Sequence, residues 1–192
     1  MSNFSETGYL YVTELFDKET ISMISEYFEN KLARGEIKIK QGIISDDEAT
    51  AISYYADPLV EVLLKKAVPF VSKAVGEILL PTYSFFRVYR SGEKLYKHVD
   101  RPSCEISVTV SVALTGEPNE IYMQAPEEKE SGFILNPGDG VIYKGCEIRH
   151  WRKPLKEGQL VVQFMLHYVR ENGPYAHLVF DSRPRLGAPS CQ

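Results

Sequence analysis

The chain has 192 residues, of which 44% are hydrophobic and 25% are charged, and its formal net charge is −4 at pH 7. This composition is typical of one globular domain with enough apolar residues for a sizeable core. The acidic balance argues against a protein that binds nucleic acid or anionic membranes through a broad basic surface, and it leaves room only for a local basic groove.

The cysteines and the N-terminal segment indicate a cytoplasmic protein. Cys104, Cys146 and Cys191 are too few for a disulfide framework and do not have CxxC zinc-site spacing. The first residues are acidic where a signal peptide is basic, and no apolar run has the length of a membrane span. We therefore expect a reducing compartment and no membrane contact. The oligomeric state is left open.

Residues 1–80 are predicted to form a helical N-terminal part. Apolar residues at helical spacing follow Asp17, which suits an N-cap, and the pattern stops at Gly35. A second helical pattern begins at Asp57, with a proline in its first turn, and ends at Gly76. Pro69 is expected to kink or divide this second helix.

Residues 83–169 are predicted to form a β-rich core. Short segments rich in β-branched and aromatic residues alternate with Gly, Pro, Asn and Asp. Such a series predicts an antiparallel sandwich or barrel with the helices packed outside, which is a mainly β fold with flanking helices (α+β). Residues 170–192 are expected to wrap irregularly around a single domain spanning residues 1–192. The predicted strands are Tyr83–Tyr89, Tyr96–Val99, Ile106–Leu114, Ile121–Met123, Phe133–Leu135, Gly140–Tyr143, Glu147–Trp151 and Leu160–Val169.

Three side chains have the character of metal ligands. His98 and Asp100 are two residues apart in a predicted strand, so they share a face with their Cα atoms about 6–7 Å apart. His150 lies in a later predicted strand that a rolled sheet brings alongside. Two imidazoles and one carboxylate on one side of an octahedral ion leave three positions open, as in oxygen-activating iron(II) sites. Taken alone, the HxD pair is a weak motif.

The surrounding segments strengthen this interpretation. Residues 83–100, YSFFRVYRSGEKLYKHVD, resemble the opening core segment of prolyl-hydroxylase-like 2-oxoglutarate/iron(II) oxygenases, where a strand ending in Tyr precedes a Gly turn and HxD. Residues 135–143, LNPGDGVIY, are similar to the family's Pro-Gly-Asp turn before a buried strand. His150, Pro154 and Gly158 have the spacing of the family's distal His, proline and turn glycine. The likeness covers residues 83–169 and, more loosely, GYLYVTELF at residues 8–16.

The resemblance implies a double-stranded β-helix (jelly roll) with iron at its mouth. It implies Fe(II) held by His98, Asp100 and His150, with 2-oxoglutarate as cosubstrate and O2 as oxidant. The implied activity couples oxidative decarboxylation of 2-oxoglutarate to succinate with hydroxylation of a substrate C–H bond. A small molecule and a peptide both remain open as the substrate.

The chain departs from this family at one position. Members carry a Lys or Arg about ten residues after the distal His to hold 2-oxoglutarate, and here that position is Leu160, followed two residues later by Val162. If residues 150–153 and 160–164 form a hairpin, Arg152 and Leu160 are cross-strand neighbours on one face. Arg152 also shares the inward direction of His150, so it is a candidate replacement that clamps the carboxylate.

Other residues complete the candidate site. Tyr89 matches a family tyrosine whose hydroxyl contacts 2-oxoglutarate, and its alternative role is core packing. Arg87 shares a face with Tyr89 and is the second candidate for the clamp. His167 and His177 are interpreted as structural or exposed, because the three-ligand set is complete without them.

Two other classes of protein stay open. Leu160 favours a cupin-like metal enzyme, such as a dioxygenase, isomerase or epimerase, that does not use 2-oxoglutarate. A non-catalytic jelly-roll module with a structural metal is the third reading, although structural sites normally have four ligands and three are evident here. The fold alone does not separate these classes.

Overall fold

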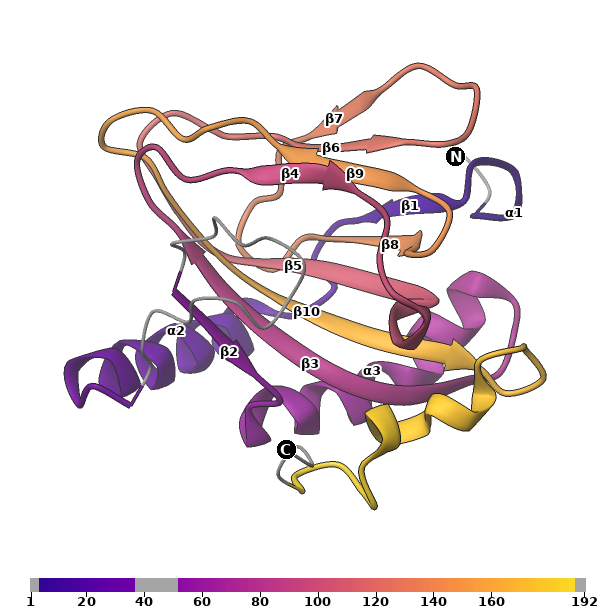
Figure 1. Cartoon of the computed structure of the whole chain (residues 1–192). Helices are drawn as coiled ribbons and strands as arrows, with labels where there is room; N and C mark the ends of the chain where they lie inside the picture. The colour runs from indigo at the N-terminus through magenta and orange to yellow at the C-terminus, as the bar shows by residue number, and fades with distance from the viewer. Residues whose placement is uncertain (1–3, 37–51, 189–192) are drawn as a thin grey trace.

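Two antiparallel sheets face each other in the computed structural model, which describes residues 4–36 and 52–188 (Figure 1). Within these residues, one sheet has six strands in the order β1 (Tyr9–Val12), β8 (Gly140–Lys144), β5 (Ile106–Thr115), β10 (Leu160–Arg170), β3 (Leu79–Tyr89) and β2 (Ile52–Tyr55). The other has four strands in the order β4 (Leu95–His98), β9 (Arg149–Arg152), β6 (Ile121–Gln124) and β7 (Ser131–Phe133). This arrangement confirms the predicted mainly β fold.

The helices cover the outer face of the larger sheet (Figure 1). They are α1 (Phe4–Thr7), α2 (Lys18–Ala33) and α3 (Pro58–Val75), while η1 (Pro102–Cys104) and η2 (Ala176–Ser182) are 3-10 turns. In the parts of the chain that the structure describes, no helix has both the length and the apolar character needed to cross a bilayer.

The predicted helix boundaries are confirmed by their caps. The Asp17 carboxylate accepts a hydrogen bond from the Thr20 N–H, and Asp57 accepts one from the Leu59 N–H. Gly76 ends α3 with φ at +84°, a conformation that glycine adopts without strain. The predicted division at Pro69 is wrong: α3 continues through it, because apolar residues on both sides of the proline are buried against the sheet.

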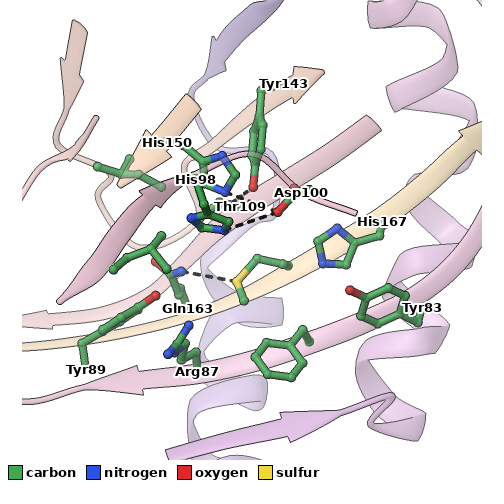
Figure 2. A pocket seen from close by; sticks show the side chains of 14 residues that line it. Tyr83, Arg87, Tyr89, His98, Asp100, Thr109, Tyr143, His150, Gln163 and His167 are labelled. Atoms are coloured by element: carbon green, nitrogen blue, oxygen red, sulfur yellow. Dashed lines mark hydrogen bonds and ion pairs between the residues drawn. The ribbon is translucent and has the colours of Figure 1, made fainter. Parts of the chain in front are cut away.

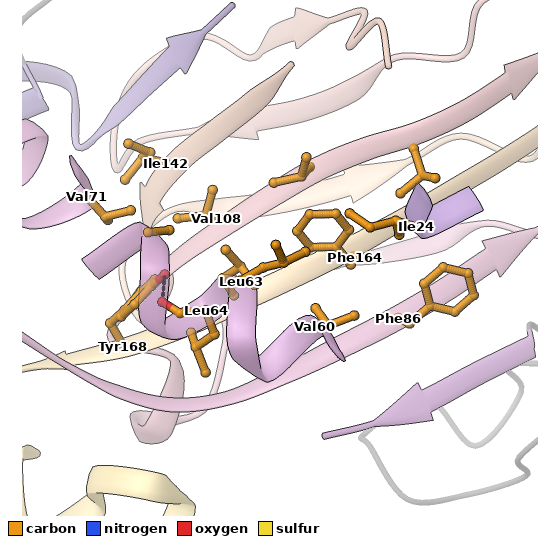
Figure 3. Close-up of a cluster of buried hydrophobic side chains, with 14 of the residues drawn as sticks. Ile24, Val60, Leu63, Leu64, Val71, Phe86, Val108, Ile142, Phe164 and Tyr168 are labelled. Atoms are coloured by element: carbon orange, nitrogen blue, oxygen red, sulfur yellow. Dashed lines mark hydrogen bonds between the residues drawn. The ribbon is translucent and has the colours of Figure 1, made fainter. Parts of the chain in front are cut away.

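Side-chain alternation in the larger sheet separates an apolar layer from a polar interior. On β5, Val108, Val110 and Val112 face the helices and join the main core, in which Val108 and Phe86 are labelled in Figure 3. The ring of Phe86 stacks on that of Phe28 in the same core. The alternate residues of β5 are Ser107, Thr109 and Ser111, and they face the space between the sheets. The two-residue period therefore places polar groups inside the roll, where the candidate site lies.

Two short strands were not predicted. β1 pairs with β8, and β2 pairs with β3, both inside the part expected to be helical. Each has four residues and lies at an edge of the sheet, so its conformation depends on the neighbouring strand more than on its own propensity. The predicted strand at 133–135 is also displaced, since β7 ends at Phe133.

The predicted hairpin between residues 150–153 and 160–164 is wrong. β9 pairs with β4 and β6, whereas β10 pairs with β5 and β3 in the other sheet. Arg152 therefore lies opposite Leu95 and Ile121, and Leu160 lies opposite Thr115. The connection between β9 and β10 crosses from one sheet to the other, which is how a jelly roll links its two layers.

Candidate active site

The three predicted ligands converge at the end of the smaller sheet. His98 on β4 lies directly opposite His150 on β9. Asp100 was predicted to lie in the same strand as His98, but it lies in the loop after β4. There its N–H donates to the Gly145 carbonyl. Ligand atoms of the three side chains lie within 4.8 Å of one another. The structure thus brings them together, and their role as metal ligands stays a prediction.

Backbone carbonyls orient both imidazoles. His98 Nδ1 lies 2.7 Å from the Tyr96 carbonyl and His150 Nδ1 lies 3.1 Å from the Ile148 carbonyl, so each Nδ1 donates. The opposite nitrogens then face the carboxylate: Nε2 of His98 and of His150 lie 3.6 Å and 3.4 Å from Asp100 Oδ1. Bonds of this kind fix the tautomer and direction of a metal-ligating histidine.

Asp100 is held as a carboxylate. Burial raises its pKa, but the adjacent His150 and His98 outweigh burial and keep the pKa well below its usual range. Its second oxygen, Oδ2, accepts a hydrogen bond of 2.8 Å from the Ser107 hydroxyl. The charged form is therefore the one that the surroundings stabilise.

A cavity extends from this triad into the roll between the sheets (Figure 2). It holds about 480 Å³ of space, including its open mouth, and strands of both sheets line it. The triad lies on one wall, and Arg87 and Tyr89 of β3 lie on the opposite wall (Figure 2).

Arg87 has unused hydrogen-bonding capacity. Its Nε is buried and has no hydrogen-bond partner among residues 4–36 and 52–188. Its guanidinium carbon lies 5.0 Å from the centre of the Tyr89 ring, and Arg87 is paired across the sheet with Gln163 of β10. A buried guanidinium N–H without a partner costs free energy, so this donor suits an anionic ligand.

Arg152 points inward as predicted, yet it does not line the cavity. Its guanidinium donates to the Asn119 carbonyl at 2.8 Å and to Gln163 Oε1 at 2.9 Å. Burial lowers its pKa to about 10. Most of its donors are therefore already used by the protein, although its Nε has no partner in the described residues.

The first part of β10 explains the departure at Leu160. Leu160 and Val162 pack against the apolar layer under the helices. The residues of β10 that face the interior are Val161 and Gln163. All four residues are uncharged, so this part of β10 places no cation in the cavity.

Sequence reasoning missed two residues at this site. His167, interpreted as structural or exposed, is 5% exposed and lines the cavity. The signal was present in β10, where Gln163, Met165 and His167 alternate with apolar residues and so share one face. Gly145 carries no chemical signal, and only the contact of its carbonyl with Asp100 reveals it.

The comparisons with known proteins identify the fold. No family model matches the sequence, and no curated protein matches it. A Pseudomonas putida prolyl-4-hydroxylase is similar with a TM-score of 0.68 and 15% sequence identity, over 85% of this chain and 95% of that chain. The non-heme alpha ketoglutarate dependent epimerase SnoN has a TM-score of 0.75 and 12% identity, over 99% of this chain and 90% of that chain. A Trichoplax adhaerens prolyl hydroxylase in complex with a peptide fragment has a TM-score of 0.71 and 12% identity, over 94% of this chain and 90% of that chain. The chain has the fold of the 2-oxoglutarate/iron(II) oxygenases. The predicted double-stranded β-helix is thereby confirmed.

Proposed function

We propose that this protein is a mononuclear iron(II)- and 2-oxoglutarate-dependent oxygenase that hydroxylates a substrate C–H bond. The observation that supports it most directly is the convergence of two imidazole Nε2 atoms and one carboxylate at the mouth of this fold. A facial set of two histidines and one carboxylate leaves positions open on the ion for ligands and O2. The proposal includes one domain over residues 1–192 and a cytoplasmic setting.

The donor set fits iron(II). The Nδ1 atoms of His98 and His150 each donate to a backbone carbonyl, so each Nε2 carries a free lone pair. Both Nε2 atoms lie close to Asp100 Oδ1. When bound, iron(II) would couple the decarboxylation of 2-oxoglutarate, which gives succinate and CO2, to hydroxylation, with one atom of O2 entering succinate and the other the substrate. The chain's own contribution is to hold the three ligand atoms, to bind the cosubstrate and to keep water from the cavity.

We assign the cosubstrate clamp to Arg87 in place of Arg152. Arg87 lines the cavity across from the triad, and its buried Nε has no partner in the described residues. Arg152 does not line the cavity, and both of its terminal nitrogens are bonded, to Asn119 and Gln163, although its Nε is also without a partner there. Tyr89 lies under both guanidinium groups, at 5.0 Å and 5.7 Å from its ring centre. Arg152 then supports the clamp by fixing Gln163 and Tyr89. The epimerase SnoN has been solved with Fe3+ and alpha ketoglutarate.

A cupin-like metal enzyme that does not use 2-oxoglutarate is the second candidate. The observation that favours it is that the interior positions at the start of β10, Val161 and Gln163, are uncharged. A structural metal module has less support, because it would need a fourth protein ligand. For the substrate, a small molecule and a peptidyl group are both candidates, because the cavity is open at its mouth.

Metal titration and product analysis together test the proposal. The wild type should bind about one iron(II) or manganese(II) per chain and release succinate from 2-oxoglutarate. His98→Ala and His150→Ala should abolish metal binding and leave the fold intact. His177→Ala is the matched control, since this histidine is exposed and distant in sequence from the ligands. Full metal stoichiometry in either ligand variant would refute the triad. Metal binding without succinate would favour the cupin-like enzyme.

A further inference from the structure

His167 lies in the same cavity, away from the proposed cosubstrate clamp. It is on the interior face of β10, four residues beyond Gln163, which is the residue paired with Arg87. Figure 2 shows His167 and Tyr83 on one side of the triad and Arg87 and Tyr89 on the other. The proposed oxygenase mechanism gives His167 no task, although the side chain is almost completely buried.

A chain of hydrogen bonds fixes the tautomer of His167. The Ser107 hydroxyl donates its single proton to Asp100 Oδ2 at 2.8 Å. Ser107 Oγ also lies 2.9 Å from His167 Nδ1, and in this contact the hydroxyl can only accept. His167 Nδ1 therefore carries the proton, and Nε2 has a free lone pair.

The free nitrogen has no protein partner in the part of the chain that the structure describes, and the ring borders the cavity. Burial lowers the pKa of His167 to about 4, against an opposing effect of Asp100, so the ring is neutral at physiological pH. A neutral imidazole with a protonated Nδ1 presents an acceptor, and not a cation, to whatever enters the cavity.

The other walls on this side are apolar or already bonded. Tyr83 and Phe85 of β3 and Met165 of β10 line the cavity there. The Tyr83 hydroxyl lies 3.1 Å from Cys104 Sγ, so these two groups satisfy each other. Asp100, Cys104 and His167 are close enough to hold a second ion. The Ser107 hydroxyl already bonds two of them, which favours a polar network over a metal site.

From these contacts we propose that His167 is a specificity-determining residue whose Nε2 accepts a hydrogen bond from a hydroxyl or amide N–H of the substrate. The proposal rests on the oxygenase function, because the triad next to this acceptor is what makes the bound group a substrate. The substrate class is an uncharged molecule or residue with a hydrogen-bond donor next to an apolar surface that fits against Tyr83 and Phe85. A site built to accept such a proton discriminates strongly against analogues without it.

Three substitutions separate this contact from a structural role. His167→Asn retains a donor near the Nδ1 position, so it preserves the bond to Ser107 and loses the acceptor. His167→Gln places an amide oxygen near the Nε2 position, so it retains the acceptor and loses the bond to Ser107. His167→Phe removes both and retains the ring. Phenol is the probe, and anisole, which lacks the O–H, is its matched control.

Binding is measured by the Mn(II)-induced broadening of the probe's proton resonances, with zinc-loaded protein as the diamagnetic reference. Phenol should bind the wild type about 3- to 10-fold more tightly than anisole, as expected for one neutral hydrogen bond. His167→Asn and His167→Phe should abolish this preference, and His167→Gln should recover part of it. All variants should bind Mn(II).

Other outcomes would overturn the proposal. Equal binding of phenol and anisole to the wild type, an undiminished preference in His167→Asn, or no phenol binding at all would each exclude the acceptor role. The 15N resonances of His167 in the metal-free protein provide an independent measurement: they should show the Nδ1–H tautomer and shift on adding phenol. If the protein binds no metal but these shifts occur, the oxygenase proposal fails and the acceptor site stands.

Discussion

Gly145 is the residue that most tightly constrains the triad. A Cβ at this position would lie 2.0 Å from the Cys104 carbonyl oxygen, 2.7 Å from Asp100 Oδ2 and 2.9 Å from Ser107 Oγ. The Gly145 carbonyl also accepts the N–H of Asp100. The absence of a side chain therefore lets the loop carrying Asp100 approach the turn after β8.

We predict that Gly145→Ala weakens Mn(II) binding by about 10- to 100-fold. The added methyl group would disturb the hydrogen bond between Asp100 and Ser107, and loss of a hydrogen-bond partner of a metal ligand typically weakens metal binding by this factor. The same overlap should lower the free energy of unfolding by about 1–3 kcal/mol. Titration by electron paramagnetic resonance and chemical denaturation measure the two effects. Gly76→Ala is the control: it strains the cap of α3 but meets no atom within 4 Å, so Mn(II) affinity should stay unchanged. Normal Mn(II) affinity in Gly145→Ala would contradict the prediction.

Arg87 and Arg152 differ in what they leave available to a ligand. Arg87→Met should weaken 2-oxoglutarate binding by about 2–3 kcal/mol, because a desolvated, charge-assisted pair is lost, and metal binding should persist. Arg87→Lys should retain only part of the wild-type affinity for 2-oxoglutarate, since an ammonium group lacks the planar, two-pronged geometry of a guanidinium. Isothermal titration of 2-oxoglutarate into Mn(II)-loaded protein measures both.

Arg152 provides the comparison. Arg152→Met should destabilise the fold, because Asn119 and Gln163 lose a buried donor, and should weaken 2-oxoglutarate binding less than Arg87→Met does. The double change Arg152→Leu with Leu160→Arg should not restore binding, since Leu160 faces the helices. A larger loss of affinity in Arg152→Met than in Arg87→Met would return the clamp to Arg152.

At the scale of elements, α3 depends on one acidic residue with two roles. Asp57 caps the helix through the Leu59 N–H and pairs with Lys31 of α2, whose Nζ lies 2.6 Å from Oδ2. Asp57 is 1% exposed, so removing it leaves a partly buried ammonium without its partner. The cap and the ion pair thus connect α3 to α2.

We predict that Asp57→Ala lowers the free energy of unfolding by about 2–4 kcal/mol, combining the loss of the cap with the loss of the ion-pair partner. Asp17→Ala, which removes only the exposed cap of α2, should lower it less. Urea denaturation measures both values, and metal binding should be normal in both variants. Equal losses would mean that the pair with Lys31 contributes nothing.

At the scale of the whole molecule, the C-terminal segment connects distant parts of the chain. Asp181 lies near the end of η2. Its carboxylate accepts two hydrogen bonds of 2.8 Å from Arg101 and one from Tyr55 of β2. Arg183 is buried and pairs with Glu61 of α3. Since Arg101 directly follows Asp100, this segment also braces the loop of the proposed metal site.

The Asp181 contacts predict a pH dependence of stability. Burial raises the pKa of Asp181, but the bonds from Arg101 and Tyr55 outweigh it and lower the pKa to about 2. Because the folded-state pKa is depressed, the stabilisation is complete above the ordinary value and is lost as the pH falls from about 4 to about 2. Asp181→Asn should cost about 1 kcal/mol at neutral pH, discounted for exposure of Arg101.

Denaturation of the wild type and Asp181→Asn across this range tests the sign. The difference in free energy of unfolding should be constant near neutral pH and shrink on acidification. A difference that grows at low pH would show that Asp181 does not stabilise the fold as a carboxylate.

Much of the secondary structure was predictable because its signals are local. The helix ends depend on residues within one helical turn, namely the caps at Asp17 and Asp57 and the αL glycine at Gly76. The strands β5 and β10 were predictable because buried apolar and polar residues alternate along consecutive positions. The short edge strands β1 and β2 were missed, since the pairing with β8 and β3 that extends them comes from residues far along the chain.

The candidate site divides in the same way. The sequence by itself determined the candidate ligand set at His98, Asp100 and His150. It also determined that Arg87 shares a face with Tyr89 and Arg152 a face with His150, because side-chain direction follows from the strand period. Only the tertiary structure decided what those side chains meet. The step from β9 to β10 crosses between sheets, so the neighbours of Arg152 are Asn119 and Gln163, and not Leu160. Whether a guanidinium is satisfied or free depends on such long-range contacts, which no local pattern encodes.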